Sequence, residues 1–136
     1  MTLTDLISQI NLSSDLSFTA QKVDGSDDVA LISYEGMDEF PILVTVNEYQ
    51  TKVQMHIAQA SEVKPDMVEE LNSVLLNMNP LLSLSAVGLD QGDYIAYGVL
   101  SSDSKFESFT KEVDALVENS VNEIFPLFTD YLVQES

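Results

Sequence analysis

The stretch from Ser102 to Tyr131, SDSKFESFTKEVDALVENSVNEIFPLFTDY, has the longest unbroken helical period in the chain. Its apolar residues recur three or four positions apart, which places them in one stripe along a helix. They are Phe106, Phe109, Val113, Leu116, Val117, Val121, Ile124, Phe128 and Tyr131. Ser102 and Ser104 are candidate caps, and Glu107 stands three positions after Ser104, as in a capping box. Pro126 predicts a kink or a short separate final turn. The stripe needs a partner surface, which the rest of the chain is expected to provide.

The segments before this helix carry both helix and strand signals. Thr2 predicts the cap of a first helix that extends to about Asn11. Pro65 predicts the first turn of a second helix, which Asn79 and the proline after it stop. Six runs rich in strand-forming residues are bounded by turn residues. They are Ser17–Val23, Val29–Tyr34, Phe40–Val46, Thr51–Gln59, Leu84–Leu89 and Tyr94–Leu100.

The predicted element order is therefore α-β-β-β-β-α-β-β-α. Most of the strands follow one another through short turns, and strands joined in this way pair with their neighbours. We expect a single α+β domain over residues 1–136, with a mainly antiparallel sheet and helices packed on it.

Charge is the most distinctive bulk property of the chain. Its 136 residues include 23 acidic and 5 basic side chains and one histidine, for a formal net charge of −18. Phosphate binding depends on lysine and arginine, and this chain has no arginine, so we expect no nucleic-acid partner and no binding to anionic membranes. The same field attracts a protein with basic segments. The alternative is that the charge only keeps the chain soluble.

No feature of the sequence predicts export or a membrane span. Residues Met1 to Asn11 hold no positive cluster followed by an apolar run. The apolar runs are far shorter than the roughly 20 residues that a membrane helix needs. The chain contains no cysteine, which excludes disulfides and thiolate sites. We therefore expect a cytoplasmic protein.

The sequence shows no catalytic constellation. His56 is the only histidine, and strand alternation places it opposite Val53 and Met55, so we expect it at the surface. A hydrolase that uses His56 would need an acid or a hydroxyl beside the ring. Paired acids of the glycosidase kind would need a deep cleft, for which this chain leaves little room. We predict no enzyme activity, no catalytic residue, no cofactor and no metal site.

Two acidic turns resemble fragments of calcium loops. Asp24–Asp28 surrounds Gly25, and Asp90–Asp93 surrounds Gly92. Both turns lack the full series of alternating acids and the distal glutamate of such a loop. Hairpin turns explain these residues better, and calcium binding stays an alternative.

The end of the chain carries more apolar residues than one helix face needs. They are Phe125, Leu127, Phe128, Tyr131, Leu132 and Val133. Exposed apolar patches mark contacts between proteins. We predict that Phe125, Phe128 and Tyr131 line a protein contact, in a homodimer or with a partner. The alternative is that these residues pack locally over the sheet.

Several short motifs lie between Gly36 and Leu132. They are Gly36–Leu43, Leu82–Leu84, Val87–Leu89, Gly92–Tyr94, Gly98–Ser102 and Leu116–Asn119. With these motifs the chain resembles the YjfI-like proteins, a bacterial family of unknown function. The resemblance implies no activity, cofactor or catalytic residue, and it implies an accessory role beside phage-shock-like membrane-stress proteins. The element order, small size and acidity are also similar to those of type III secretion chaperones, which are commonly dimeric and hold another protein.

Two functional hypotheses follow from these observations. The first is a non-enzymatic, acidic adaptor or chaperone-like protein, a homodimer, whose partner is a protein with basic or apolar segments. The second is a regulatory protein that binds a small molecule or an ion in a pocket between the sheet and the helices.

Overall fold

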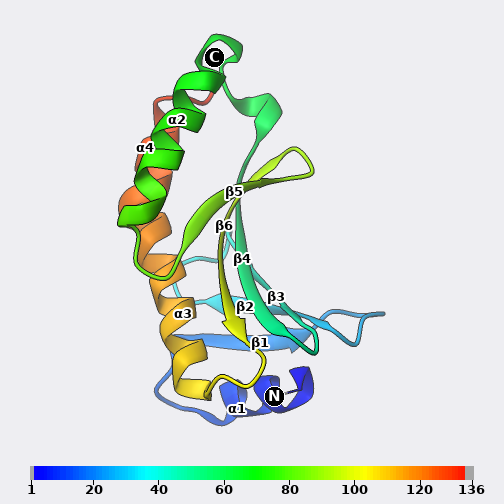
Figure 1. The fold of residues 1–136 in the computed structure, drawn as a ribbon. Helices are drawn as coiled ribbons and strands as arrows, with labels where there is room; N and C mark the ends of the chain where they lie inside the picture. Colours follow the sequence, from blue (N-terminus) through cyan, green and yellow to red (C-terminus); the bar gives the residue numbers. More distant parts are fainter. Residues whose placement is uncertain (1, 134–136) are drawn as a thin grey trace.

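The computed structural model describes residues 2–133, which form a six-stranded sheet with helices packed against it (Figure 1). The strands are β1 (Phe18–Lys22), β2 (Val29–Tyr34), β3 (Ile42–Val46), β4 (Gln50–Gln59), β5 (Ala86–Asp90) and β6 (Asp93–Ser101). The helices are α1 (Leu3–Leu12), α2 (Val68–Met78), α3 (Phe106–Asn119) and α4 (Phe125–Thr129). The predicted α+β fold and its order of major elements are confirmed.

The sheet is antiparallel throughout, with the spatial order β1-β2-β3-β4-β6-β5. Strands β1 and β5 are therefore its two edges. One row of paired residues crosses the sheet from β2 to β5 and is buried along its whole length. It consists of Ile32, Ile42, Met55, Ala96 and Val87. Because side chains alternate between the faces of a strand, this row defines the core face of the sheet.

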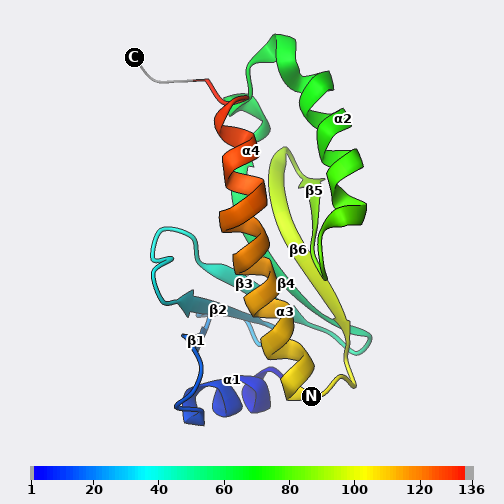
Figure 2. The ribbon, with the colours of Figure 1, turned by 90° about the vertical axis from the view of Figure 1, so that its left-hand side faces the viewer.

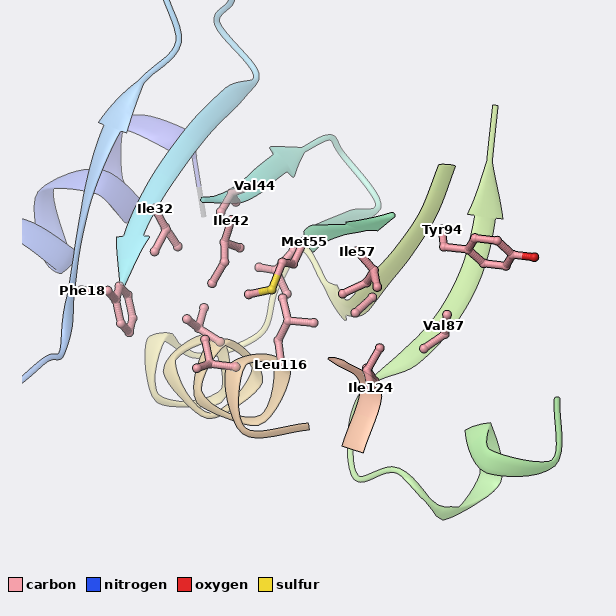
Figure 3. Packing of buried hydrophobic residues seen from close by; sticks show 14 of the residues in the cluster. Phe18, Ile32, Ile42, Val44, Met55, Ile57, Val87, Tyr94, Leu116 and Ile124 are labelled. Carbon is pink, nitrogen blue, oxygen red and sulfur yellow. The ribbon is translucent and has the colours of Figure 1, made fainter. Parts of the chain in front are cut away.

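The helices cover this core face, as the two perpendicular views show (Figures 1 and 2). Leu116 and Ile124 from the long C-terminal segment are fully buried against the sheet. In Figure 3 the side chains of Met55, Leu116 and Ile124 lie in the same packed layer. Interiors of this kind are as dense as organic crystals, so the helices and the sheet fix each other's positions.

The first two helices begin as the sequence predicts. The Asp5 N–H donates to Thr2 Oγ1 over 3.1 Å, which confirms Thr2 as the cap of α1. Pro65 opens a 3-10 turn, Pro65–Met67, that leads into α2. A second 3-10 turn, Asn79–Leu81, follows α2 because proline cannot continue the helical ladder.

The closing helix differs from the prediction in two ways. Lys105 is the N-cap of α3 and makes no side-chain cap bond, so the predicted capping box is wrong. The Ser102 hydroxyl donates instead to the Glu48 carbonyl, over 2.8 Å, and ties the loop before α3 to the β3–β4 turn. Between α3 and α4 the chain forms a π-helical turn, Ser120–Ile124. Its wider winding turns Ser120 inward and leaves Val121 exposed, although the stripe places Val121 in the core.

Pro126 lies in the first turn of α4. The N–H that proline lacks would have no helical partner at this position, so the proline fits there without cost. The short helix α4 is therefore the separate final turn that Pro126 predicts. Within residues 2–133, no helix is both long enough and apolar enough to cross a membrane.

Candidate protein-interaction surface

The three residues predicted to line a protein contact lie against this chain's own core. Phe128 is 1% exposed, and its ring meets Tyr94 edge-on with centroids 5.2 Å apart. Phe125 is half-buried, with its ring centroid 4.6 Å from that of Phe40. Tyr131 is buried, and its carbonyl accepts the Lys64 N–H. This placement matches the alternative of local packing, and a contact role for these residues stays a prediction.

Several exposed apolar side chains come instead from one segment, which runs from the C-terminal half of α2 to the edge strand β5. We call this set the leucine patch. It consists of Leu76, Leu81, Leu84 and Leu89, each more than half exposed. Large side chains of this kind scattered singly over a surface are ordinary, but a group on one segment marks a contact surface.

The backbone at Leu84, in the loop before β5, has an unusual conformation. Leu84 has φ +66°, in the left-handed region that side chains other than glycine rarely adopt. Such a conformation costs about 1–2 kcal/mol and persists only where the surroundings hold it. Asn119 helps to hold this loop, because its amide donates to the Ser83 carbonyl over 2.8 Å. The strained residue presents its side chain to solvent with 60% exposure.

The charge pattern separates this region from the rest of the molecule. Residues 71–89 contain no charged side chain, and no other uncharged run in the sequence is as long. Acids border the run in the sequence at Glu70 and Asp90, and Glu123 lines the hollow beside Leu81. The leucine patch is thus a neutral, apolar area with acidic neighbours on a chain of net charge −18.

A groove runs beside the patch, between α2 and strands β5 and β6. It has a volume of about 260 Å³. Its lining consists of Asn72, Leu75, Leu76, Asn79, Val87, Gly88, Leu89 and Tyr94. The Tyr94 hydroxyl donates to Asn72 Oδ1 over 2.6 Å, and burial raises the pKa of Tyr94, so the phenol stays neutral. The Asn79 amide bonds to the backbone of Val87.

Much of the polar lining of this groove is therefore already bonded within the chain. What remains is mainly a surface for apolar groups. A groove of this volume is smaller than typical sites for drug-sized ligands, which hold about 300–1,000 Å³. Its size suits one or two apolar side chains of another protein.

A second, shallower hollow lies on the other side of α2, against α4. It has a volume of about 530 Å³. Its lining includes Val74, Met78, Leu81, Pro126 and Leu127. The C-terminal half of α2 thus contributes residues to two apolar hollows, and Figure 2 shows where α2 lies relative to α4, β5 and β6.

His56 lies at the surface, as its alternation predicts. Its Nε2 atom is 3.4 Å from Asp93 Oδ1, and both side chains are about half exposed. The ring thus has an acid neighbour, but no hydrogen bond joins it to a hydroxyl anywhere in residues 2–133. A nucleophile activated by this pair is not present in the described structure.

The acidic turns make ordinary surface interactions. Asp27 pairs with Lys22 over 2.9 Å, and this contact lowers the pKa of the Asp27 carboxyl. Among residues 2–133, no three potential ligands from histidine, aspartate and glutamate converge to hold a metal ion.

Sequence reasoning missed the leucine patch. Periodicity draws attention to apolar residues that will be buried, and the leucines of the patch belong to a helix end, a turn and an edge strand. The uncharged run at residues 71–89 was the sequence signal that could have indicated the patch, because 21% of the residues in the whole chain are charged and this run has none.

The antiparallel six-stranded sheet with helices on one face gives this chain the same α+β fold as chains in solved type III secretion chaperone complexes. The chain belongs to the bacterial family described as "Uncharacterized protein conserved in bacteria (DUF2170)", which matches residues 1–132. This agrees with the resemblance to a bacterial family of unknown function and extends it through the N-terminal hairpin. No curated protein matches the chain.

Solved structures of low sequence identity share the fold. A chain of the ExoU–SpcU complex from the type III secretion system of Pseudomonas aeruginosa is 14% identical, with a TM-score of 0.63 over 92% of this chain and 96% of that chain. YbjN from E. coli is 15% identical, with a TM-score of 0.66 over 98% of this chain and 94% of that one. A chain of the HopA1–SchA chaperone–effector complex is 14% identical, with a TM-score of 0.51 over 90% of each chain.

Proposed function

We propose that this protein is a non-enzymatic, chaperone-like adaptor that holds a segment of another protein on the leucine patch. The observation that carries the proposal is the patch itself, four exposed leucines within an uncharged run on a chain of net charge −18. A chain of this fold occurs in the solved HopA1–SchA chaperone–effector complex, which supports a protein partner for this fold. The protein acts as a single α+β domain, without a cofactor, in the cytoplasm.

The chemistry of the surface defines the partner segment. Apolar side chains of the partner fill the two hollows beside α2, one lined by Leu76 and Leu89 and the other by Leu81, and its basic side chains meet the surrounding acids. Acidic rims of this kind raise the rate of encounter with a basic partner and lose that effect as salt screens it. The partner is therefore an amphipathic segment rich in leucine and lysine or arginine. The family resemblance favours a partner from a phage-shock-like membrane-stress system.

Binding of a designed peptide tests the proposal. One fluorescent peptide combines leucine with lysine at helical spacing, and a matched peptide carries glutamate in place of lysine. We expect the lysine peptide to bind the wild-type protein and Leu81→Asp to weaken that binding about tenfold or more, as for a central contact residue. The matched control is Leu12→Asp, because Leu12 is equally exposed but lies outside the patch.

Two results of this titration would contradict the proposal. If Leu81→Asp and Leu12→Asp weaken binding equally, the patch is not the contact. If the lysine peptide fails to bind at low salt, the class of partner is wrong.

We further propose that the protein is a homodimer. Two strongly acidic copies repel each other, so they meet most easily where acids are absent, and the leucine patch is such an area. Sedimentation over a range of concentrations measures the mass directly. A wild-type protein that stays monomeric at every concentration removes the dimer and leaves the partner proposal intact.

The groove also favours a second candidate function, a regulator that binds a small apolar molecule between α2 and the sheet. Thermal unfolding with a metabolite panel and with calcium separates this candidate from the adaptor, because a ligand specific for the native state raises the midpoint by mass action. A shift that Leu76→Asp abolishes would support the regulator.

A further inference from the structure

The two edge strands of the sheet are each held by an asparagine from the helix before them. Asn11 lies near the end of α1, and Asn79 follows the end of α2. The Asn11 amide donates to the Ala20 carbonyl over 2.9 Å, and its Oδ1 accepts the Ala20 N–H over 3.1 Å. The Asn79 amide does the same for Val87, over 3.0 Å and 2.8 Å.

Each asparagine therefore bonds to both backbone groups of one residue. In an antiparallel ladder, two opposite residues exchange their N–H and C=O groups in this way. The side-chain amide thus stands where the backbone of an additional strand would stand. We call these two contacts the edge clamps.

Each clamp occupies one outward-facing position of its edge strand. Ala20 is the middle residue of β1, and Val87 is the second residue of the five-residue strand β5. Because backbone groups alternate along a strand, Leu89 is the only other residue of β5 whose groups face outward. A strand that joined β5 would have to displace Asn79 to pair over more than one such position.

Exposed apolar residues beside both edge strands would favour strand addition by another chain. Leu12 follows Asn11 and is 86% exposed, and Leu81 and Leu84 are exposed beside the β5 edge. A free strand edge with apolar neighbours is a template for pairing with another chain. A second copy of this chain is the partner that is always available.

An ordinary role in ending a helix does not explain these contacts. Asn77 shows the ordinary case, because its amide donates to the Ser73 carbonyl within α2. Asn11 and Asn79 instead reach strands that begin several residues later, and the arrangement occurs at both edges of the sheet.

We infer that Asn11 and Asn79 determine how this protein meets other chains. They close both sheet edges to strand addition by a second copy of this chain, and so restrict contacts to side chains on its faces, such as the leucine patch. This role concerns the backbone edges and stands whether or not the patch binds a partner segment.

Hydrogen exchange on the wild-type protein gives the first test, and it needs no variant. We expect the amides of Ala20 and Val87 to exchange at least about tenfold more slowly than the unclamped outward amide of Leu89, as bonded groups do. If the amides of Ala20 and Val87 exchange as fast as that of Leu89, the clamps do not form in solution and the inference fails.

Substitution gives the second test. We expect the double variant Asn11→Ala/Asn79→Ala to form assemblies beyond the wild-type mass that grow with concentration, as measured by sedimentation. Asn77→Ala is the matched control, since its amide bonds only within α2, and it should keep the wild-type mass. Circular dichroism verifies that each variant is folded.

The outcomes of this second test are decisive in either direction. A folded double variant with the wild-type mass at every concentration overturns the role of the clamps in excluding a second copy. Assembly of the Asn77→Ala control to the same extent overturns it as well. Neither result bears on peptide binding at the leucine patch, so the two proposals fail separately.

Discussion

Gly98 on β6 lies beneath the carboxyl group of Glu112 on α3, so that a Cβ atom at position 98 would come within 2.9 Å of Glu112 Cδ. Both residues are buried, and Glu112 is 3% exposed. A side chain at position 98 would occupy the space that the carboxyl group now fills. Glycine at this position therefore allows a charged residue of α3 to lie against the sheet without displacing the helix.

Gly98→Ala should destabilise the protein by about 1–3 kcal/mol, because the added methyl group would force the buried Glu112 side chain to move. Urea unfolding measures the change. Gly88→Ala is the comparison variant, since a Cβ atom there would come no closer than 3.1 Å to its nearest neighbour, Cε1 of the half-buried Tyr97 ring. The double variant Gly98→Ala/Glu112→Ala removes the obstructing carboxyl group and should regain part of the loss. Equal losses at positions 88 and 98 would show that the Glu112 contact is unimportant.

Glu112 should make stability depend on pH. Burial raises the pKa of the Glu112 carboxyl above its ordinary value of 4.5. Between the unfolded and the folded pKa the native state binds more protons than the unfolded chain, so this group's contribution to stability is lost as pH rises through the folded pKa. Glu112→Gln cannot ionise and should be more stable than the wild type at neutral pH.

Urea unfolding over a pH series tests this sign. The difference between Glu112→Gln and the wild type should be small below pH 4.5 and should grow as the pH rises. Glu118→Gln, at an exposed position on the same helix, controls for the general relief of negative charge. If the two variants give parallel curves, the burial of Glu112 has no special effect.

The strands were predictable because their side chains alternate and their turns carry glycine. Val53 and Met55 face the core while Gln54 and His56 do not, and this pattern alone places β4 within a half-buried sheet. The glycine of each acidic turn, Gly25 and Gly92, has positive φ, which is the conformation for which such turns select it.

The closing segment was predictable only in part. Its apolar period indicated a long helix, but the π-helical turn depends on how Ser120 and Ile124 fit against the sheet, and no local pattern encodes that fit. The leucine patch had a signal only in the missing charges of residues 71–89. Hydrophobicity predicted residues that interact, but only the fold decides whether the partner is this chain or another.

Ser120→Ala should stabilise the protein by about 1 kcal/mol, because the buried Ser120 hydroxyl has no hydrogen-bond partner and its removal ends a desolvation cost. Thermal and urea unfolding measure the gain. Ser108→Ala on exposed α3 surface controls for the higher helix propensity of alanine. A Ser120→Ala variant that gains no more than Ser108→Ala would show that the hydroxyl is satisfied, for example by a buried water molecule.

Truncation of Phe128 should cost far more stability than truncation of Leu81, and this difference separates core residues from contact residues. Phe128→Ala removes a fully buried ring that packs against Tyr94 and should cost about 3–5 kcal/mol of stability. Leu81 is 82% exposed, so Leu81→Ala should change stability by less than about 0.5 kcal/mol. Urea unfolding measures both variants, and sedimentation measures their mass. If Phe128→Ala keeps its stability but changes the mass or the peptide affinity, then Phe128 faces another chain in solution, and the contact belongs at the end of the chain rather than at the leucine patch.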